Sequence, residues 1–147
     1  MKKVKKYLIA FLLTMAPFAH AVDHLVFFCT NAQGKQVRVT EQGGKFRYQF
    51  GKPKRAELVF ENDRQEAIDR SPRWGGIGRD LWTNLVLQNG DYQYALFSSM
   101  DRLSPRHETV YGVTVHRLVN GEEQYVTQVK CSKKRKIVVN FPEELMF

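Results

Sequence analysis

The sequence contains few of the residues on which metal or redox chemistry depends, since only two cysteines, Cys29 and Cys131, occur in 147 residues. No Cys-x-x-Cys pair and no second cluster accompany them, which argues against a thiolate metal site or a catalytic dithiol. In an oxidising compartment a lone pair of cysteines most simply forms one disulfide. We therefore predict a bridge between Cys29 and Cys131, with no metal and no cofactor.

Long apolar runs are also absent, because no stretch beyond residue 21 approaches the ~20 residues that cross a bilayer. The start of the chain instead has lysines at 2, 3, 5 and 6, a short apolar run at 7–15 and the small-x-small sequence Ala-His-Ala at 19–21. This order is typical of a secretory signal peptide. We predict a signal peptide at 1–21, a single β domain at 22–147 without a transmembrane segment, and export to a bacterial periplasm.

The sequence also lacks recognisable catalytic motifs. A nucleophile would have to be Ser98 or Ser99, with His107 or His116 and Asp101, but no Gly-x-Ser-x-Gly elbow surrounds either serine. A metal site would need His24, His107 and His116 to converge, and their spacing matches no ligand template. We therefore predict no catalytic residue and a protein that is not an enzyme.

The positive charge is concentrated in two short stretches. The formal net charge is +8. Four lysines lie in the predicted signal peptide, and five lysines and arginines lie within residues 130–136. The rest of the chain is nearly neutral, so we expect no nucleic-acid partner. The run of Lys133, Lys134, Arg135 and Lys136 fits an anionic envelope surface, such as lipopolysaccharide or a cell-wall polymer. It fits equally well a solvated run that protects an edge strand.

Alternation of apolar and polar residues predicts an all-β fold of about eight strands. The clearest case is 45–50, where Phe46, Tyr48 and Phe50 share one face. Asn89-Gly90 and Asn120-Gly121 are typical of tight hairpin turns. The predicted strands are 25–29, 36–40, 45–50, 56–61, the two arms of 85–100, 109–119, 125–131 and 137–141, followed by a loose tail at 143–147.

These strands predict a small antiparallel barrel or sandwich with one disulfide. We favour the barrel, because cysteines near opposite ends of the chain would bring the first and last strands together. The predicted inward residues of the later strands are Leu85, Leu87, Tyr92, Tyr94, Leu96, Tyr111, Val113, Val115, Tyr125, Val129 and Cys131.

Residues 62–80 interrupt the strand pattern. A single helical turn capped by Asn62 or Asp63 is expected first, and the glycines at 75, 76 and 78 then exclude regular structure. This glycine-rich loop resembles a phosphate-binding loop only superficially, because it does not open a helix after a buried strand. A turn that lets Trp74 and Trp82 pack is the better interpretation.

Two irregular loops carry the residue types that anchor protein interfaces. The first is the glycine-rich loop, and the second follows residue 99; a solvated connection explains the second loop equally well. As candidate partner-binding residues we assign Arg73, Trp74, Arg79, Met100, Arg102 and Arg106.

The sequence resembles the c-type lysozyme inhibitors in three places: Phe-Phe-Cys ending at Cys29, Gln-Val-Lys-Cys ending at Cys131, and Gly-Asp-Tyr-x-Tyr between them. The resemblance implies a periplasmic β-barrel that inhibits a hydrolase by binding it. This chain is longer than those inhibitors and lacks their lipid-attachment cysteine. Their inhibitory motif has no counterpart here, so no inhibitory residue is carried over.

Together these features predict a non-catalytic periplasmic protein that binds a protein partner. The partner would be an envelope-targeted enzyme or toxin, which the protein would inhibit or neutralise as a lysozyme-type inhibitor or an immunity protein. The alternative is a module that binds lipopolysaccharide or cell-wall polymer through its basic run.

Overall fold

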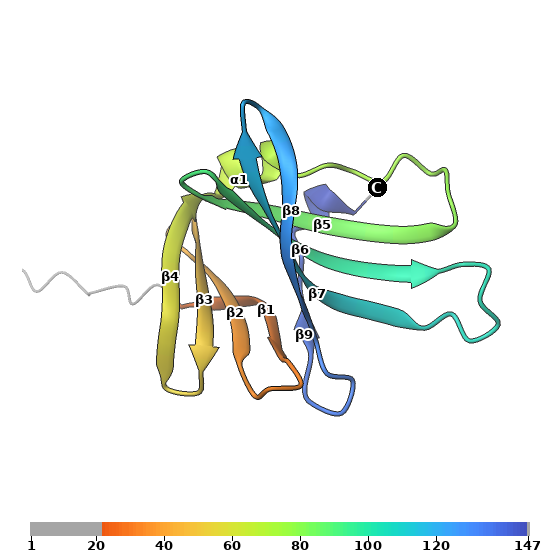
Figure 1. Ribbon diagram of the computed structural model, residues 1–147, viewed down its shortest axis with the longest axis horizontal. Coiled ribbons are helices and arrows are strands. Elements are labelled where there is room, and N and C mark those ends of the chain that lie inside the picture. The colour runs from red at the N-terminus through yellow and green to blue at the C-terminus, as the bar shows by residue number, and fades with distance from the viewer. Residues whose placement is uncertain (1–21, 147) are drawn as a thin grey trace, which may run out of the picture.

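The computed structural model describes residues 22–146, so the predicted signal peptide lies outside the described residues. The predicted all-β class is confirmed, because the chain forms two antiparallel sheets (Figure 1). The first sheet has five strands in the order β4-β3-β2-β1-β9. Their bounds are β1 His24–Thr30, β2 Gln36–Gln42, β3 Lys45–Lys52, β4 Arg55–Asp63 and β9 Val138–Val139.

The second sheet has four strands in chain order, β5 Asp80–Asn89, β6 Tyr92–Asp101, β7 Thr109–Val119 and β8 Glu122–Lys130. Helix α1, Arg64–Arg70, connects the two sheets, and a 3-10 turn, η1 at Glu143–Leu145, follows β9. In Figure 1 the strands β5 to β7 cross the first sheet steeply and extend well beyond it. The second sheet therefore has a supported part and a projecting end.

The barrel favoured from the sequence is wrong, because the two sheets do not close on each other. At the junction of β4 and β5, side chains replace the backbone ladder that closure would need. The amide of Asn62 donates to the Gln88 carbonyl at 2.7 Å and accepts from the Gln88 N–H at 2.6 Å. The hydroxyl of Ser71 accepts from the Val86 N–H at 2.8 Å. These side chains satisfy the backbone groups of Val86 and Gln88 at the edge of β5 without a neighbouring strand.

The core lies between the sheets and draws fully buried side chains from both. Val37 and Phe46 come from the first sheet, while Leu85, Leu96 and Val113 come from the second. Each sheet presents one face to this core, as the period-two pattern predicted. The central aromatic residue is Tyr48, whose ring lies 4.9 Å from Phe60 and 5.2 Å from Tyr94, and burial raises the pKa of its hydroxyl.

The predicted disulfide is confirmed. Cys29 in β1 and Cys131, immediately after β8, are bonded with their Cα atoms 5.5 Å apart. Because β1 belongs to the first sheet and β8 to the second, the bridge joins the two sheets covalently.

One hairpin forms as predicted and the other is displaced. Asn120 and Gly121 occupy the turn between β7 and β8 with φ of 53° and 81°. Between β5 and β6, however, Asn89 pairs with Tyr92, so the central residues are Gly90 and Asp91. Only glycine of these two needs positive φ, as in a type II′ turn. Every cross-strand pair moves by two residues, which leaves the predicted inward face unchanged.

A bulge in β8 makes one core prediction wrong. Tyr125 was expected inward with Val129, yet the register between β7 and β8 shifts between Val115 and His116. Tyr125 therefore pairs with His116 and is 67% exposed. Since a bulge adds one residue to a strand, it reverses the face of the residues beyond it.

The helix and the C-terminal segment differ in how well the sequence predicted them. Asp63 caps α1 as expected, accepting a hydrogen bond from the Glu66 N–H at 3.1 Å. The segment after β9 is not a loose tail, because Leu145 is buried in the core. Arg64 of α1 also pairs with Glu144 at 3.0 Å, and this lowers the pKa of the Glu144 carboxyl.

Candidate functional site

The two loops singled out from the sequence lie side by side at the projecting end of the second sheet. Residue Asp80 at the start of β5 pairs with Asp101 at the end of β6, so the loops 72–79 and 102–108 leave the sheet at the same end. We call these two loops together the loop tip. Figure 1 shows it at the far right, away from the first sheet.

An ion pair ties the two loops together. The guanidinium of Arg79 donates to both carboxylate oxygens of Asp101, at 2.6 to 3.0 Å. This paired geometry is the strongest that arginine and a carboxylate form. Hydrogen bonds from Arg79 hold the pKa of the Asp101 carboxyl below its usual range, and the pKa of Arg79 is raised in return.

Arg102 makes a second set of contacts between the loops. Its backbone N–H donates to the Arg79 carbonyl at 3.1 Å, and its side chain donates to the carbonyl of Gly78. The guanidinium also lies over the ring of Trp74, 5.1 Å from the centroid. Trp74 therefore packs beneath Arg102, and no ring contact joins it to Trp82 within the described residues, contrary to expectation.

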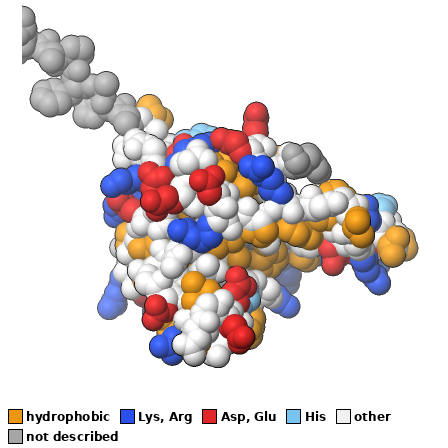
Figure 2. All heavy atoms as spheres, turned by 90° about the horizontal axis from the view of Figure 1, so that it is seen from above, with side chains coloured by type: hydrophobic (Ala, Val, Ile, Leu, Met, Phe, Trp, Pro, Cys, Tyr) orange, Lys and Arg blue, Asp and Glu red, His pale blue; other side chains and the backbone are white. Residues whose placement is uncertain are grey.

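The most exposed apolar side chains of the loop tip were missed from the sequence. Ile77 in the first loop is 89% exposed, and Leu103 in the second loop is 73% exposed. A large aliphatic residue between glycines, and another within a polar connection, was the available signal. Figure 2 shows hydrophobic atoms at this projecting end with basic side chains beside them.

The remaining assigned residues divide between the loop tip and the sheet. Arg73 is exposed, and Arg106 is exposed with Glu108 at 3.9 Å. Met100 was expected on an exposed loop, but it lies within β6, paired with Leu81 and partly buried. Thus the structure brings four of the six residues to the projecting end, leaves Arg73 near Glu144 of η1 at the start of the first loop, and assigns Met100 to the sheet that supports the tip.

The basic run lies in the loop between β8 and β9. Lys133 pairs with Glu108 at 2.6 Å, which links this loop to the second loop of the tip. Lys134, Arg135 and Lys136 are exposed and form no ion pair with any residue in 22–146. Three adjacent cations are therefore available to an anionic partner.

The residues considered for catalysis do not form a site. Ser98 and Ser99 lie within β6 rather than at its end, on opposite faces of the sheet. His116 lies on β7 with its ring 6.2 Å from that of Tyr125, whereas His107 lies in the loop tip with a φ of 46°. Among residues 22–146 no group of three or more histidine, cysteine or acidic side chains is placed to hold a metal ion.

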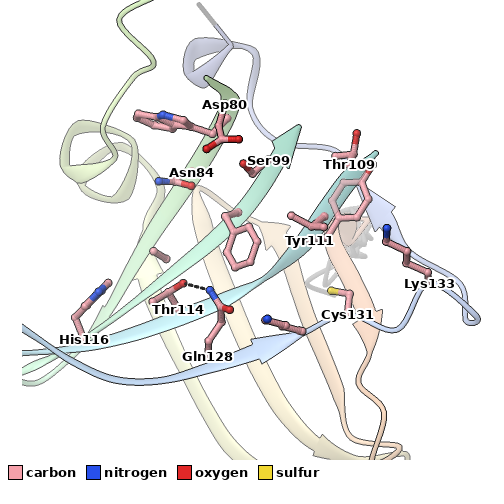
Figure 3. A pocket seen from close by; sticks show the side chains of 15 residues that line it. Asp80, Asn84, Ser99, Thr109, Tyr111, Thr114, His116, Gln128, Cys131 and Lys133 are labelled. Carbon is pink, nitrogen blue, oxygen red and sulfur yellow. Dashed lines mark hydrogen bonds between the residues drawn. The ribbon is translucent and has the colours of Figure 1, made fainter. Parts of the chain in front are cut away.

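A groove of about 620 Å³ crosses the outer face of the second sheet. Its lining includes Trp82 of β5 and Phe97 of β6. Figure 3 shows three more of its residues, Asn84 of β5, Thr114 of β7 and Gln128 of β8. The sequence contained the signal, because these residues alternate with the core residues of the same strands, but only the inward set was used for prediction.

No protein-family model, curated protein or solved structure matches the chain. The resemblance to the c-type lysozyme inhibitors stays a prediction. Within the described part of the chain, no helix has both the length and the hydrophobicity needed to cross a membrane.

Proposed function

We propose that this is a non-catalytic periplasmic protein that binds a protein partner through its loop tip. The partner is an envelope-targeted enzyme or toxin, which the protein inhibits or neutralises by occupying a cleft. The observation that supports this function best is the pair of exposed aliphatic side chains, Ile77 and Leu103, on two loops that are fixed to each other.

The fixed geometry favours a protein partner because binding would require little ordering. Arg79, Asp101 and Arg102 already hold the loops in one arrangement, so less conformational entropy is lost on association. Apolar side chains at the centre with arginines around them match the composition of interface hot spots. The exposed Arg106 would then face acidic residues at the rim of the partner's cleft.

Export to the periplasm fits both the disulfide and the predicted signal peptide. A bridge between Cys29 and Cys131 persists in oxidising compartments and is rare in the cytosol. The enzymes and toxins that act on the envelope reach that same compartment. A rigid projection that blocks an active-site cleft is therefore a suitable device for inhibition.

Photo-crosslinking from the loop tip tests the proposal. A crosslinking amino acid at Leu103 should capture a hydrolase or toxin from periplasm, whereas the same group at Val59, an exposed site on β4, should not. The purified protein should inhibit the captured enzyme, and Ile77→Asp with Leu103→Asp should abolish inhibition. Equal capture from both positions, or full inhibition by the double variant, would overturn the proposal. So would a lack of protection against every lysozyme and toxin tested.

The basic loop supports a second candidate function, binding to an anionic envelope polymer. Lys134, Arg135 and Lys136 are exposed and adjacent, and each would contribute about 1 kcal/mol near an anionic surface. Replacing all three by Gln should abolish sedimentation with lipopolysaccharide and its dependence on salt. Unchanged sedimentation of the triple variant would exclude this candidate.

A further inference from the structure

From the groove on the outer face of the second sheet, we infer that the protein binds an oligosaccharide that carries carboxylate groups. The loop tip and the basic loop contribute nothing to this inference beyond Lys133, so it is independent of the proposed function. The groove has the volume of a small-ligand site, for which about 300–1,000 Å³ is typical.

The floor of the groove is aromatic and firmly placed. Trp82 and Phe97 come from neighbouring strands and lie along the groove with Ala95 and Val110. The ring of Phe97 lies next to Gly112, its neighbour on β7, where an added Cβ would come within 2.9 Å of a ring atom. The missing side chain at Gly112 therefore provides the space that the Phe97 ring occupies.

Polar side chains border the aromatic floor. The Gln128 amide donates to the Thr114 hydroxyl at 3.1 Å, as the dashed line in Figure 3 marks. The amide of Asn84 forms no side-chain hydrogen bond to any residue in 22–146, and Ser99 adds a hydroxyl. Amides and hydroxyls both donate and accept hydrogen bonds, so they match a ligand with the same dual capacity.

A sugar ring has this combination of properties. Its C–H face carries small positive charges that pack on the negative face of an aromatic ring, and its hydroxyls reach the polar border. An acyl chain would leave the amides and hydroxyls unpaired, which is costly in a buried interface. An extended peptide that binds by adding a strand needs a sheet edge, but this groove crosses the face of a sheet. A peptide strand is therefore a poorer match for the groove.

The charges on the two sides of the groove indicate a carboxylate. Lys130 and Lys133 line one side, and Lys130 pairs with no carboxylate in the described residues. Lys133 contacts Glu108, but its ammonium has three donors, so donors remain for a ligand. Asp80 lies on the β5 side of the groove, away from Lys133 in Figure 3, and would repel an acidic group there. The carboxylate thus sets the direction in which the sugar chain lies.

Fluorescence of Trp82 tests the inference. The chain has two tryptophans, so Trp74→Phe leaves Trp82 as the only reporter, and it lines the groove. Hyaluronan hexasaccharide, which carries carboxylates, should change the emission saturably and bind at least about tenfold more tightly than neutral chitohexaose, because a charged hydrogen bond adds roughly 1.5 kcal/mol. No change at millimolar hyaluronan, or equal affinity for the two sugars, would overturn the inference.

Matched variants in the same background show where the sugar lies. Phe97→Ala should weaken hyaluronan binding at least about tenfold, since stacking and apolar contact are both lost. Tyr92→Ala, which removes a half-exposed aromatic of the same strand outside the groove, should leave binding unchanged. Thermal melting confirms that each variant is folded. If Phe97→Ala binds normally while the triple Gln variant of the basic loop does not, the sugar lies on that loop and the inference is wrong.

The two functions also separate experimentally. Ile77→Asp with Leu103→Asp should leave sugar binding intact, because neither residue lines the groove. Phe97→Ala should leave capture of the protein partner intact. Failure of one function in these assays therefore carries no consequence for the other.

Discussion

The supported part of the molecule and its projecting end are held together by different forces. Between the sheets, side chains such as Phe46 and Leu85 are fully buried, and burial of apolar surface dominates. At the loop tip the contacts are an exposed ion pair and a cation–π contact, which contribute little to global stability. Stability therefore resides in the supported part, apart from the proposed recognition site, and changes at the loop tip should leave the fold intact.

Of the changes considered, loss of the disulfide should lower the stability of the supported part most. Its two cysteines are 102 residues apart, so replacing both with Ala should lower the free energy of unfolding by about 4 kcal/mol. Urea unfolding followed by circular dichroism measures the change. A loss below about 1 kcal/mol would mean that the buried core alone holds the sheets together.

A pair of leucine substitutions compares the two parts directly. Leu85→Ala should cost about 3 kcal/mol, because it opens a cavity in the shared core. Leu103→Ala removes the same atoms from an exposed loop and should change stability by less than about 0.5 kcal/mol. Similar losses in urea unfolding would contradict the separation of stability from recognition.

A pair of serine substitutions tests the junction of the sheets. Ser71 is buried and its hydroxyl bonds both the Val86 N–H and the Ala67 carbonyl, so Ser71→Ala should cost about 2 kcal/mol. Ser104→Ala in the loop tip should cost less than about 0.5 kcal/mol. Amide exchange at Val86 should accelerate only in the first variant; unchanged exchange there would show that another group satisfies this N–H.

The smallest effect on stability is expected from lowering the pH, which protonates Asp101 at the loop tip. Hydrogen bonds from Arg79 lower the pKa of Asp101 below its ordinary value of 3.8. The ionised carboxylate therefore orders the tip above pH 3.8, and this contribution is lost as the pH falls through the lower pKa of the folded state. Carbon NMR of the Asp101 carboxyl should show its pKa rise toward 3.8 in Arg79→Gln. An unchanged titration would mean that Arg79 does not organise the loops.

Local patterns in the sequence predicted the strands well. Alternation such as that of 45–50 depends only on which face meets the core, and Asn120-Gly121 encodes its turn directly. The first hairpin was displaced because Asn89-Gly90-Asp91 offers two adjacent turns, and Gly90 suits both. The inward face was still predicted, since the displacement preserved the alternation.

Features that depend on distant residues were beyond these patterns. Asn62 and Ser71 read as polar loop residues, and only the folded chain shows that they take the place of a strand beside β5. The closed barrel was therefore predicted wrongly. The bulge that exposes Tyr125 likewise depends on the pairing of β8 with β7.

The candidate site was predicted in its parts but not in its assembly. Both loops carried recognisable anchor residues, yet the pairing of Arg79 with Asp101 and of Arg102 with Trp74 requires the register of β5 and β6. Ile77 and Leu103 were overlooked because an isolated apolar residue in a loop is common. Their exposure becomes informative only on a fixed projection.

The side chains of Asn62 and Ser71 have a consequence for how molecules of this protein meet one another. An unpaired strand edge invites intermolecular β-pairing and so fibrous aggregation. At Val86 and Gln88 of β5 that edge is already occupied, so an incoming strand would first have to displace both side chains. On the second sheet, strand addition by another copy is therefore hindered at this end of β5, and β8 is the other edge at which it could occur.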